Sequence, residues 1–427
     1  MSILFVVNSD NKLFEIDSGG ALRNNLFIRA LSEIGHVDVI CFSQNDIISN
    51  IQNCDVIYSK RLTDTKDFKE VFRSLLSVTL WPSNPYSYYQ VNEQKAAIIN
   101  EFVDKNGYDI IACRYAETSI ICGLLKYRDK LVIDLDDNQA NVLKFEAIQE
   151  QSMLKRWKKL YESKRIGRML EKLSNNVQCL FCSNPLELPS SKTIYLHNTT
   201  VLEIPTTDKT ESSRPRILFV GFLNFYPNKQ GITHFVKSVF PSVKAAIPHA
   251  ELRIVGDGKQ DFLDFLNGID GVEAVGKVAD LALEYLETSV VIIPIYYGSG
   301  TCVKFVEAML MNRPVISSPI GARGFSDVCK DGEDYMLAID DKEFVNKTIE
   351  LLSSVSKSKE IANNGFEKAK RHYSQDKFIE IVKNAILIMM SKKNTTKRLN
   401  ENQYYNSYLW GRTLYRKMFK IGLLPNV

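Results

Sequence analysis

A glycine-rich turn followed by a lysine and a glutamate is the strongest chemical signal in the chain. Gly298-Ser299-Gly300-Thr301 comes after a short apolar run, and Lys304 and Glu307 lie in the helical pattern that begins near Thr301. A strand, turn and helix in this order direct backbone N–H groups and the positive end of a helix dipole at an anion. Thr301 can cap the helix, Lys304 adds positive charge, and the Glu307 carboxylate can accept hydrogen bonds from two ribose hydroxyls. The pattern predicts a site for a diphosphate and a ribose; an ordinary turn with a surface Lys and Glu is the other interpretation, and the spacing is not that of a P-loop.

A second candidate anion site lies near the start of the chain. Ser18-Gly19-Gly20-Ala21 follows the first predicted strand and opens a helical pattern that contains Arg23. Backbone N–H groups at such a helix start can bind phosphate oxygens. The same residues would also fit a loop that merely caps its helix.

An acidic run, Asp134-Leu135-Asp136-Asp137, ends another predicted strand. Read alone as Asp-x-Asp, it would indicate a metal-dependent transferase of a different fold. We instead predict that Asp136 and Asp137 bind hydroxyl groups of an acceptor, with a local helix cap as an equally good interpretation. No His, Asp or Glu cluster completes a metal site, so we predict no metal, and we interpret Cys179-x-x-Cys182 as structural because no second pair of ligands accompanies it.

The elements that must position these residues alternate between short β-branched runs and longer helical patterns. Such alternation is typical of parallel α/β units. Strands are predicted at 3–7, 37–42, 56–59, 110–113, 131–135, 178–182 and 193–196, and then at 216–220, 251–255, 272–275, 290–294 and 314–317. Helical patterns include 21–33, 154–173, 232–246 and 302–311, with three more starting near 341, 357 and 375.

A polar segment at 205–215, PTTDKTESSRP, divides this series and is interpreted as an interdomain linker. We therefore predict an α/β protein with two Rossmann-like, doubly wound domains, 1–204 and 216–390, that face a central cleft, with helices at the C-terminal end. Ligands are expected where the carboxyl ends of the strands meet that cleft.

Five motifs of the second half occur in an order that resembles GT-B-fold, retaining glycosyltransferases of family 4 (glycosyl transferases group 1). They are Ile217-Leu218-Phe219-Val220-Gly221 with Pro227-Asn228-x-x-Gly231, Leu252-x-Ile254-Val255-Gly256-x-Gly258, Gly276-x-Val278-x-Asp280-Leu281, Gly298-Ser299-Gly300-Thr301-x-x-Lys304-x-x-Glu307-Ala308, and Pro314-Val315-Ile316-Ser317 with Gly321-x-x-Gly324. The resemblance is strong over 216–325 and much weaker upstream.

The resemblance implies roles for individual residues. Glu307 matches the glutamate that binds the nucleotide ribose, backbone at 299–301 would hold donor phosphate or sugar hydroxyls, and Lys277-Val278 would flank the base. Taken with the candidate sites above, the predicted donor-binding set is Gly19, Gly20, Arg23, Gly221, Lys229, Val278, Gly298, Ser299, Gly300, Thr301, Lys304 and Glu307, and the predicted catalytic set is Asp136, Ser299 and Lys304.

The chain departs from the family pattern at two of its positions. Ser299 replaces the first glutamate of the Glu-x7-Glu pair, and Phe222 stands where an arginine often follows the glycine of the first strand. The positive charge for the diphosphate is therefore left to Lys304, Arg23 or Lys229.

The function that this resemblance implies is a retaining, metal-independent transfer of a sugar from a UDP- or GDP-linked donor to a glycan or lipid-linked acceptor, in the synthesis of cell-surface polysaccharide or glycoconjugates. The nucleotide sugar is then a substrate, and no cofactor is expected. Two alternatives stay open: a non-catalytic protein that binds a nucleotide sugar, and a nucleotide-sugar epimerase of the same fold.

Charge and composition bear on location and partners. A net charge of +4 over 427 residues is too small to indicate a nucleic-acid partner. The sequence shows neither the basic start, apolar core and cleavage site of a signal peptide nor an apolar run long enough to span a membrane. We therefore expect a cytoplasmic protein. Residues 391–427 carry eight Lys or Arg and a single acid, Glu401, interleaved with aromatics. This tail is predicted either to bind an anionic membrane, such as the inner face of the plasma membrane, or to form a last helix packed on the N-terminal domain.

Overall fold

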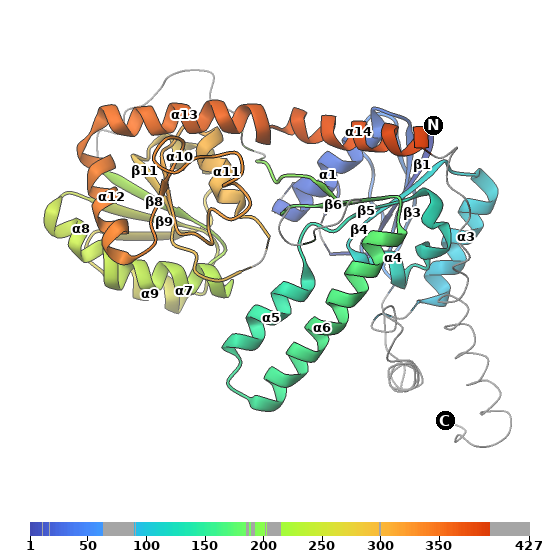
Figure 1. Cartoon of the computed structure of the whole chain (residues 1–427), viewed down its shortest axis with the longest axis horizontal. Coiled ribbons are helices and arrows are strands. Elements are labelled where there is room, and N and C mark those ends of the chain that lie inside the picture. Colours follow the sequence, from blue (N-terminus) through green and yellow to red (C-terminus); the bar gives the residue numbers. More distant parts are fainter. Residues whose placement is uncertain are drawn as a thin grey trace. The chain divides into compact units, whose positions relative to one another are not determined.

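The chain folds into two compact units in the computed structural model, which describes residues 1–392 except 11, 17, 63–88, 90, 185–187, 189–192, 201, 203–214 and 299. The first unit contains Met1–Leu196 and the chain from Ile379 onward, and the second contains His197–Phe378. Figure 1 shows a parallel sheet with helices in each.

The first unit is built on a seven-stranded sheet in the order β3-β2-β1-β4-β5-β6-β7. All neighbouring strands are parallel, and β1 lies between β2 and β4. Strands of a parallel sheet with both faces covered are apolar throughout, which is why Ile3 to Val7 are all buried. The strands are β1 (Ser2–Val7), β2 (His36–Cys41), β3 (Cys54–Ser59), β4 (Ile110–Arg114), β5 (Leu131–Asp134), β6 (Cys179–Cys182) and β7 (Thr193–Tyr195).

The helices of this unit follow the strands in alternation. They are α1 (Gly19–Ser32), α3 (Glu93–Asn106), α4 (Ala116–Ile121), a 3₁₀ helix (Leu124–Lys130), α5 (Gln139–Gln149) and α6 (Met153–Asn176). Local signals fix several of their starts: Ser18 caps α1, Asn92 caps α3 and Asn138 caps α5 through side-chain oxygens. The pair α5 and α6 projects from the unit as a helical hairpin (Figure 1).

The second unit has a six-stranded parallel sheet in the order β10-β9-β8-β11-β12-β13. Its strands are β8 (Arg216–Val220), β9 (Glu251–Val255), β10 (Val272–Gly276), β11 (Val290–Ile293), β12 (Val315–Ser317) and β13 (Met336–Leu337). Its helices are α7 (Tyr226–His234), α8 (Phe240–Ala246), α9 (Gln260–Asn267), α10 (Leu281–Leu286), α11 (Val303–Leu310), α12 (Asp341–Ser353) and α13 (Val355–Tyr373), and α14 (Gln375–Lys392) carries the chain back to the first unit.

Both sheets are doubly wound, so the predicted fold class is confirmed. The strand order reverses between β1 and β4 in one unit and between β8 and β11 in the other. In open α/β sheets, ligands bind beyond the carboxyl ends of the strands at such a switch point. The glycine-rich turn after β11 and the helix start after β1 both lie at these places in their own units.

Two local features differ from the sequence prediction. The single helix predicted at 232–246 is interrupted by a π-helical turn, Phe235–Val239. Pro241 stands in the first turn of α8, where its missing N–H cannot continue the ladder of the preceding helix. The short edge strand β13 was not predicted, because two residues are too few to show a period of alternation.

The division into units also differs from the predicted ranges. The structure divides the chain at Leu196 and groups Ile379 onward with the first unit, whereas the predicted second domain ran to residue 390. The predicted linker at 205–215 lies outside the described residues apart from Pro215, and the predicted tail lies outside them beyond Lys392. Among the described residues, no helix has the length and apolar character needed to span a membrane.

Candidate functional site

The glycine-rich turn follows β11 as predicted, although the helix starts later than expected. Gly298 and Gly300 have φ of +142° and +72°, which favour glycine, and α11 begins at Val303 rather than near Thr301. The Thr301 hydroxyl does not cap the helix but accepts a hydrogen bond from Asn198 Nδ2 at 2.9 Å. Arg323 Nη2 donates to the Gly300 carbonyl at 3.1 Å and so helps to hold the turn. Ser299 lies outside the described residues.

Lys304 is held in the first turn of α11 by a neutral partner. Its Nζ donates a hydrogen bond to Asn228 Oδ1 at 2.6 Å and lies 4.6 Å from the centroid of the Phe219 ring. Asn228 Nδ2 donates to the Phe222 carbonyl, which turns the amide oxygen toward the lysine. Burial lowers the pKa of the Lys304 amine to about 8, although Cys302 and Glu307 act in the other direction. An anion close to this buried amine would stabilise its charged form.

Gly221 makes room for this arrangement at the carboxyl end of β8. A Cβ on Gly221 would lie 2.8 Å from both Lys304 Nζ and Asn228 Nδ2. Gly256, after β9, is just as confined, since its Cβ would lie 1.9 Å from the Gly221 carbonyl oxygen. A side chain at residue 221 would therefore displace the Lys304 amine or the Asn228 amide, whereas the role of Gly221 in donor binding stays a prediction.

Glu307 lies one turn after Lys304, with each carboxylate oxygen held by a hydroxyl. Tyr285 Oη donates to Oε2 at 3.1 Å, and Thr200 Oγ1 donates to Oε1 at 3.3 Å. Burial raises the pKa of Glu307, and these hydrogen bonds and the charge of Lys304 oppose the shift. Because a carboxylate has about four acceptor sites, both oxygens keep capacity for ribose hydroxyls. Sequence reasoning missed Tyr285 and Thr200; Tyr285, between Glu284 and Leu286 in a short helix, carried no signal of its own.

Two other predicted donor-binding residues lie elsewhere in the second unit. Val278 is half-buried in the turn between β10 and α10, where Asp280 caps α10 through the Leu283 N–H. Lys229 is exposed on α7, and its Nζ lies 4.6 Å from the centroid of Phe262. The structure therefore brings Lys304, rather than Lys229, to Gly221.

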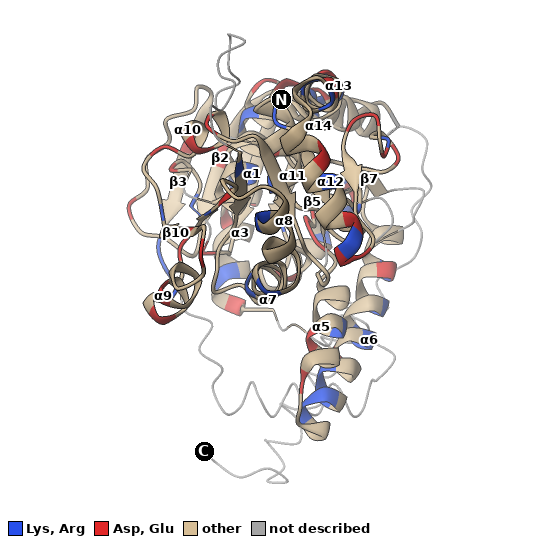
Figure 2. Cartoon of the chain, turned by 90° about the vertical axis from the view of Figure 1, so that its left-hand side faces the viewer, with Lys and Arg blue, Asp and Glu red and all other residues tan. Residues whose placement is uncertain are grey.

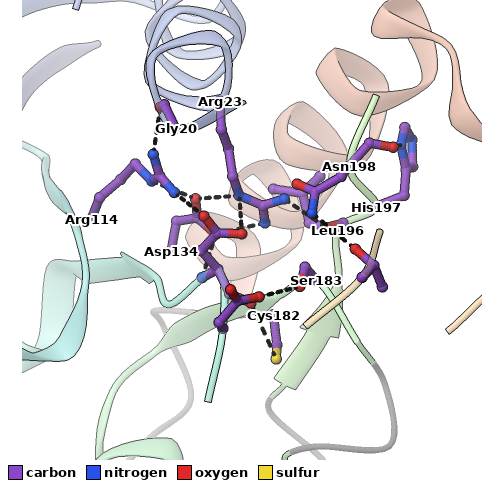
Figure 3. Close-up of polar contacts among 12 residues, drawn as sticks. Gly20, Arg23, Arg114, Asp134, Cys182, Ser183, Leu196, His197 and Asn198 are labelled. Atoms are coloured by element: carbon purple, nitrogen blue, oxygen red, sulfur yellow. Dashed lines mark hydrogen bonds and ion pairs between the residues drawn. The ribbon is translucent and has the colours of Figure 1, made fainter. Parts of the chain in front are cut away.

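A buried ion-pair network occupies the carboxyl ends of β4 and β5 in the first unit (Figure 3). Arg23 binds Asp134 through two hydrogen bonds, Nε to Oδ2 at 2.7 Å and Nη2 to Oδ1 at 2.8 Å. Arg114 Nε lies 3.0 Å from Asp134 Oδ2, and Arg114 Nη2 donates to Asp136 Oδ2 at 2.5 Å. Arg23 Nη1 donates to the Leu196 carbonyl, and Arg114 Nη1 donates to the Gly20 carbonyl and to Asn24 Oδ1. The two guanidinium groups thus converge on two carboxylates.

The electrostatics of this network favour the charged forms. Burial alone would raise the pKa of Asp134, but Arg23 and Arg114 hold it below its ordinary value. The guanidinium of Arg23 has a raised pKa in spite of burial, because Asp134 and Asp136 lie beside it. Such a pair is costly to break because one partner would be left as an uncompensated buried charge.

The backbone next to the network adopts rare conformations. Tyr115, directly after β4, has φ +66°, and Asp136, two residues after β5, has φ +62°. Residues other than glycine hold this region only where the surroundings enforce it, and such residues cluster at functional sites. Asp136 keeps 18% of its side chain exposed, so one carboxylate of the network reaches the surface beyond the strand ends.

The network includes two of the predicted site residues, Arg23 and Asp136. Arg23 is buried against Asp134 instead of lying exposed beside Gly19 and Gly20, which form the start of α1 behind the Ser18 cap. Asp134 and Asp136 face guanidinium groups, and the described residues contain no group of three or more His, Cys, Asp or Glu placed to hold a metal ion. Arg114, which sequence reasoning missed, had a signal in its position as a charged residue ending an apolar strand.

Cys179 and Cys182 are buried in β6 as thiols. Burial raises the pKa of Cys179 to about 12, and Cys182 Sγ donates to the Asn184 carbonyl at 3.4 Å. This setting agrees with their interpretation as structural residues, because a reactive or metal-binding cysteine needs its thiolate.

A family model for glycosyl transferases group 1 matches residues 214–354, all of which lie in the second unit. The match contains Gly221, Lys304 and Glu307. An uncharacterised 44.6 kDa protein in the cps region of Klebsiella pneumoniae is 25% identical over 404 residues, which cover 88% of this chain and 98% of that protein.

Solved structures resemble the chain over nearly all of its length. Sucrose-phosphate synthase from Thermosynechococcus elongatus superposes with a TM-score of 0.64 at 17% identity and covers 92% of this chain and 100% of its own. Anabaena HepE in complex with UDP and glucose gives 0.59 at 14% identity, with coverage of 92% and 100%. WaaG, a glycosyltransferase involved in lipopolysaccharide biosynthesis, gives 0.58 at 13% identity, with coverage of 91% and 99%. The chain therefore has the GT-B glycosyltransferase fold. Together with the family match, this fold supports a glycosyltransferase.

Proposed function

We propose that the protein transfers a sugar from a nucleotide-diphosphate sugar to a glycan or lipid-linked acceptor. The observation that carries this proposal is the placement of Lys304 and Glu307 one turn apart on α11, directly after the glycine-rich turn. Glu307 would bind the ribose, and Lys304 together with the backbone of Gly298, Ser299 and Gly300 would bind the diphosphate. Val278 would flank the base.

The chemistry follows from where charge develops. As the glycosidic bond to the diphosphate breaks, negative charge builds on the leaving phosphate. Lys304 Nζ and the N-terminal N–H groups of α11 are fixed before the reaction starts, so they stabilise that charge without reorganising. A fixed set of donors of this kind would replace a divalent metal, and the proposed reaction is therefore metal-independent.

The donor is proposed to be UDP-linked rather than GDP-linked. HepE, which shares the fold, has been solved with UDP and with UDP-glucose. The retaining outcome is proposed from the family resemblance of the second half. A place in polysaccharide or glycoconjugate synthesis at the cell surface is supported by the relative from a cps region.

Asp136 is proposed to bind the acceptor. Its carboxylate is oriented by Arg114, and 18% of the side chain is exposed at the ends of the strands. An acceptor hydroxyl could donate to Asp136 Oδ1, which lies 3.7 Å from Arg23 Nε. Of the predicted catalytic residues, Lys304 and Asp136 thus have defined geometry, and Ser299 stays a prediction.

The test is a panel of UDP- and GDP-linked sugars, with nucleotide release measured in the presence and in the absence of glycan acceptors. Transfer predicts release that depends on acceptor, activity that survives excess EDTA, and a product whose anomeric configuration by NMR equals that of the donor. Binding without release would instead establish a non-catalytic protein, and a change of the sugar without acceptor would establish an epimerase. Activity lost with EDTA and restored by manganese would contradict metal independence.

A further inference from the structure

At the free end of the α5–α6 hairpin, apolar side chains of α6 are exposed to solvent. Met153, Leu154 and Trp157 in the first turns of α6 have exposed fractions of 80%, 85% and 73%. Leu160 and Tyr161, one turn further, are exposed as well. With 3.6 residues per turn, this spacing places all five on one stripe along the helix.

The buried face of α6 lies opposite that stripe and begins later. Ser163, Ile166, Met169, Leu170 and Leu173 are buried, and Ser163 Oγ donates to the Ala140 carbonyl of α5 at 2.7 Å. None of residues 153–162 is buried. The first half of α6 therefore extends beyond the core of its unit and turns its apolar stripe to solvent, which an ordinary surface helix does not do.

Basic residues are numerous along α6 (Figure 2). The helix contains eight Lys or Arg but only two Glu, and by helical spacing Arg156 and Lys158 border the stripe on its two sides. Glu146 and Glu150 lie 3.2 Å and 3.6 Å from Lys159 Nζ, away from the stripe, and Glu162 Oε1 lies 4.0 Å from Lys158 Nζ, which stays 75% exposed. Apolar and aromatic side chains bordered by basic ones match the interface of an anionic bilayer, where aromatic rings lie at headgroup depth and cations meet lipid phosphates.

We propose that the hairpin tip, residues 148–161, docks the protein on a membrane of anionic phospholipids. The stripe of Met153, Leu154 and Trp157 would enter the headgroup region while Arg156 and Lys158 bind phosphates. A second copy of the chain fits less well, since it would bring a second positive border against the first. This inference does not depend on the proposed transfer reaction. It places the membrane contact on the α5–α6 hairpin rather than on residues 391–427.

The apolar contribution is tested with Leu154→Ser/Trp157→Ser in the full chain. Its matched control is Ile339→Ser/Val355→Ser, which removes two apolar side chains that are 65% and 59% exposed in the second unit. We expect the hairpin variant to bind phosphatidylglycerol-containing vesicles at least about tenfold more weakly than wild type in co-sedimentation, because buried apolar area is lost. The control should bind as wild type does, and circular dichroism melting should show both variants folded.

The charge contribution is tested with Arg156→Ala/Lys158→Ala against Lys342→Ala/Arg371→Ala, whose basic side chains are also exposed. The two variants have the same net charge. Loss of two cations at the surface should weaken binding to anionic vesicles by roughly thirtyfold in the hairpin variant and much less in the control. Vesicles of phosphatidylcholine alone should bind none of the proteins well, and salt should weaken binding of the wild type.

Trp157 reports insertion directly. The chain has three tryptophans, so Trp81→Phe/Trp410→Phe leaves Trp157 alone. Its emission should shift to the blue with anionic vesicles. Vesicle binding that the hairpin substitutions leave unchanged, an emission that does not move, or a dimer in solution that Leu154→Ser/Trp157→Ser dissociates would each overturn the proposal.

Discussion

Cations at the strand ends of the two units are stabilised in opposite ways. In the first unit, Arg23 and Arg114 face the carboxylates of Asp134 and Asp136 at 2.5 to 3.0 Å. In the second, Lys304 Nζ donates to a neutral amide oxygen of Asn228 and lies over the Phe219 ring. The pKa of both guanidinium groups is raised, whereas that of Lys304 is lowered.

Under the proposed function, the difference separates a structural use of charge in the first unit from a binding use in the second. A cation that carboxylates of its own protein neutralise stabilises the fold but interacts less with a ligand. A cation whose hydrogen-bond partner is a neutral amide would interact more strongly with a bound diphosphate. The comparison can be tested in four steps, taken from the largest expected effect to the smallest.

Asp134→Asn should break the network of the first unit. Two buried guanidinium groups would lose their shared carboxylate, and we expect the free energy of unfolding to fall by about 3–5 kcal/mol. Chemical denaturation measures it, with Asp137→Asn, an exposed carboxylate next door, as the control. Since the pKa of Asp134 is lowered in the folded protein, its stabilisation is complete above its ordinary value of 3.8 and is lost as pH falls through the lowered pKa. The variant should lack that acid-dependent loss; an equal slope in both proteins would contradict the assignment.

Glu307→Ala should weaken UDP binding by about 2–4 kcal/mol, because charge-assisted hydrogen bonds to the ribose would be lost. Isothermal calorimetry measures the affinity. Glu333→Gln, which changes an exposed carboxylate of the same unit, should bind UDP as the wild type does. Unchanged affinity in Glu307→Ala would remove the residue from the site.

Lys304→Met should cost about 1.5–3 kcal/mol of UDP affinity, the usual range for a hydrogen bond to a charged group. The pH dependence sharpens the test. Because the amine loses its proton as pH rises through about 8, wild-type affinity should fall above that pH. Lys304→Arg stays charged there and should show no such fall. The same shift predicts that the free energy of unfolding of unliganded wild type rises between about pH 8 and the ordinary lysine value of 10.5.

Lys383→Ala should have the smallest effect. Its Nζ lies 2.7 Å from Glu33 Oε2 in the first unit, but 34% and 47% of the two side chains are exposed. Exposed ion pairs contribute roughly 0.2–1 kcal/mol to the free energy of unfolding. A loss as large as that of Asp134→Asn would mean that burial does not set the strength of these pairs.

The sequence predicted the sheets well because buried parallel strands are short, continuous apolar runs. The bounds of β8 and β9 agree with those predicted, and most other strands differ by one or two residues. Helix α6 shows what the sequence could not predict. The pattern at 154–173 indicated a helix, but only the structure shows which face of that helix is buried.

The candidate site was predictable where its signal is local. Lys304 and Glu307 lie three residues apart on one helix after a glycine-rich turn, so spacing alone brings them together. Arg23 and Asp134 are 111 residues apart, and nothing local in either segment predicts that they meet. The partners of Glu307 were missed for the same reason, because Thr200 lies 107 residues from it.

The return of the chain to the first unit through α14 has a consequence for the order of folding during synthesis. Val382 and Ile386 of α14 are fully buried, and residues 379–392 belong to the unit that begins at Met1. The ribosome makes this helix only after the whole second unit. The unit translated first is therefore completed last, and the apolar surface that α14 covers stays open while the second unit, whose residues are contiguous, can already fold.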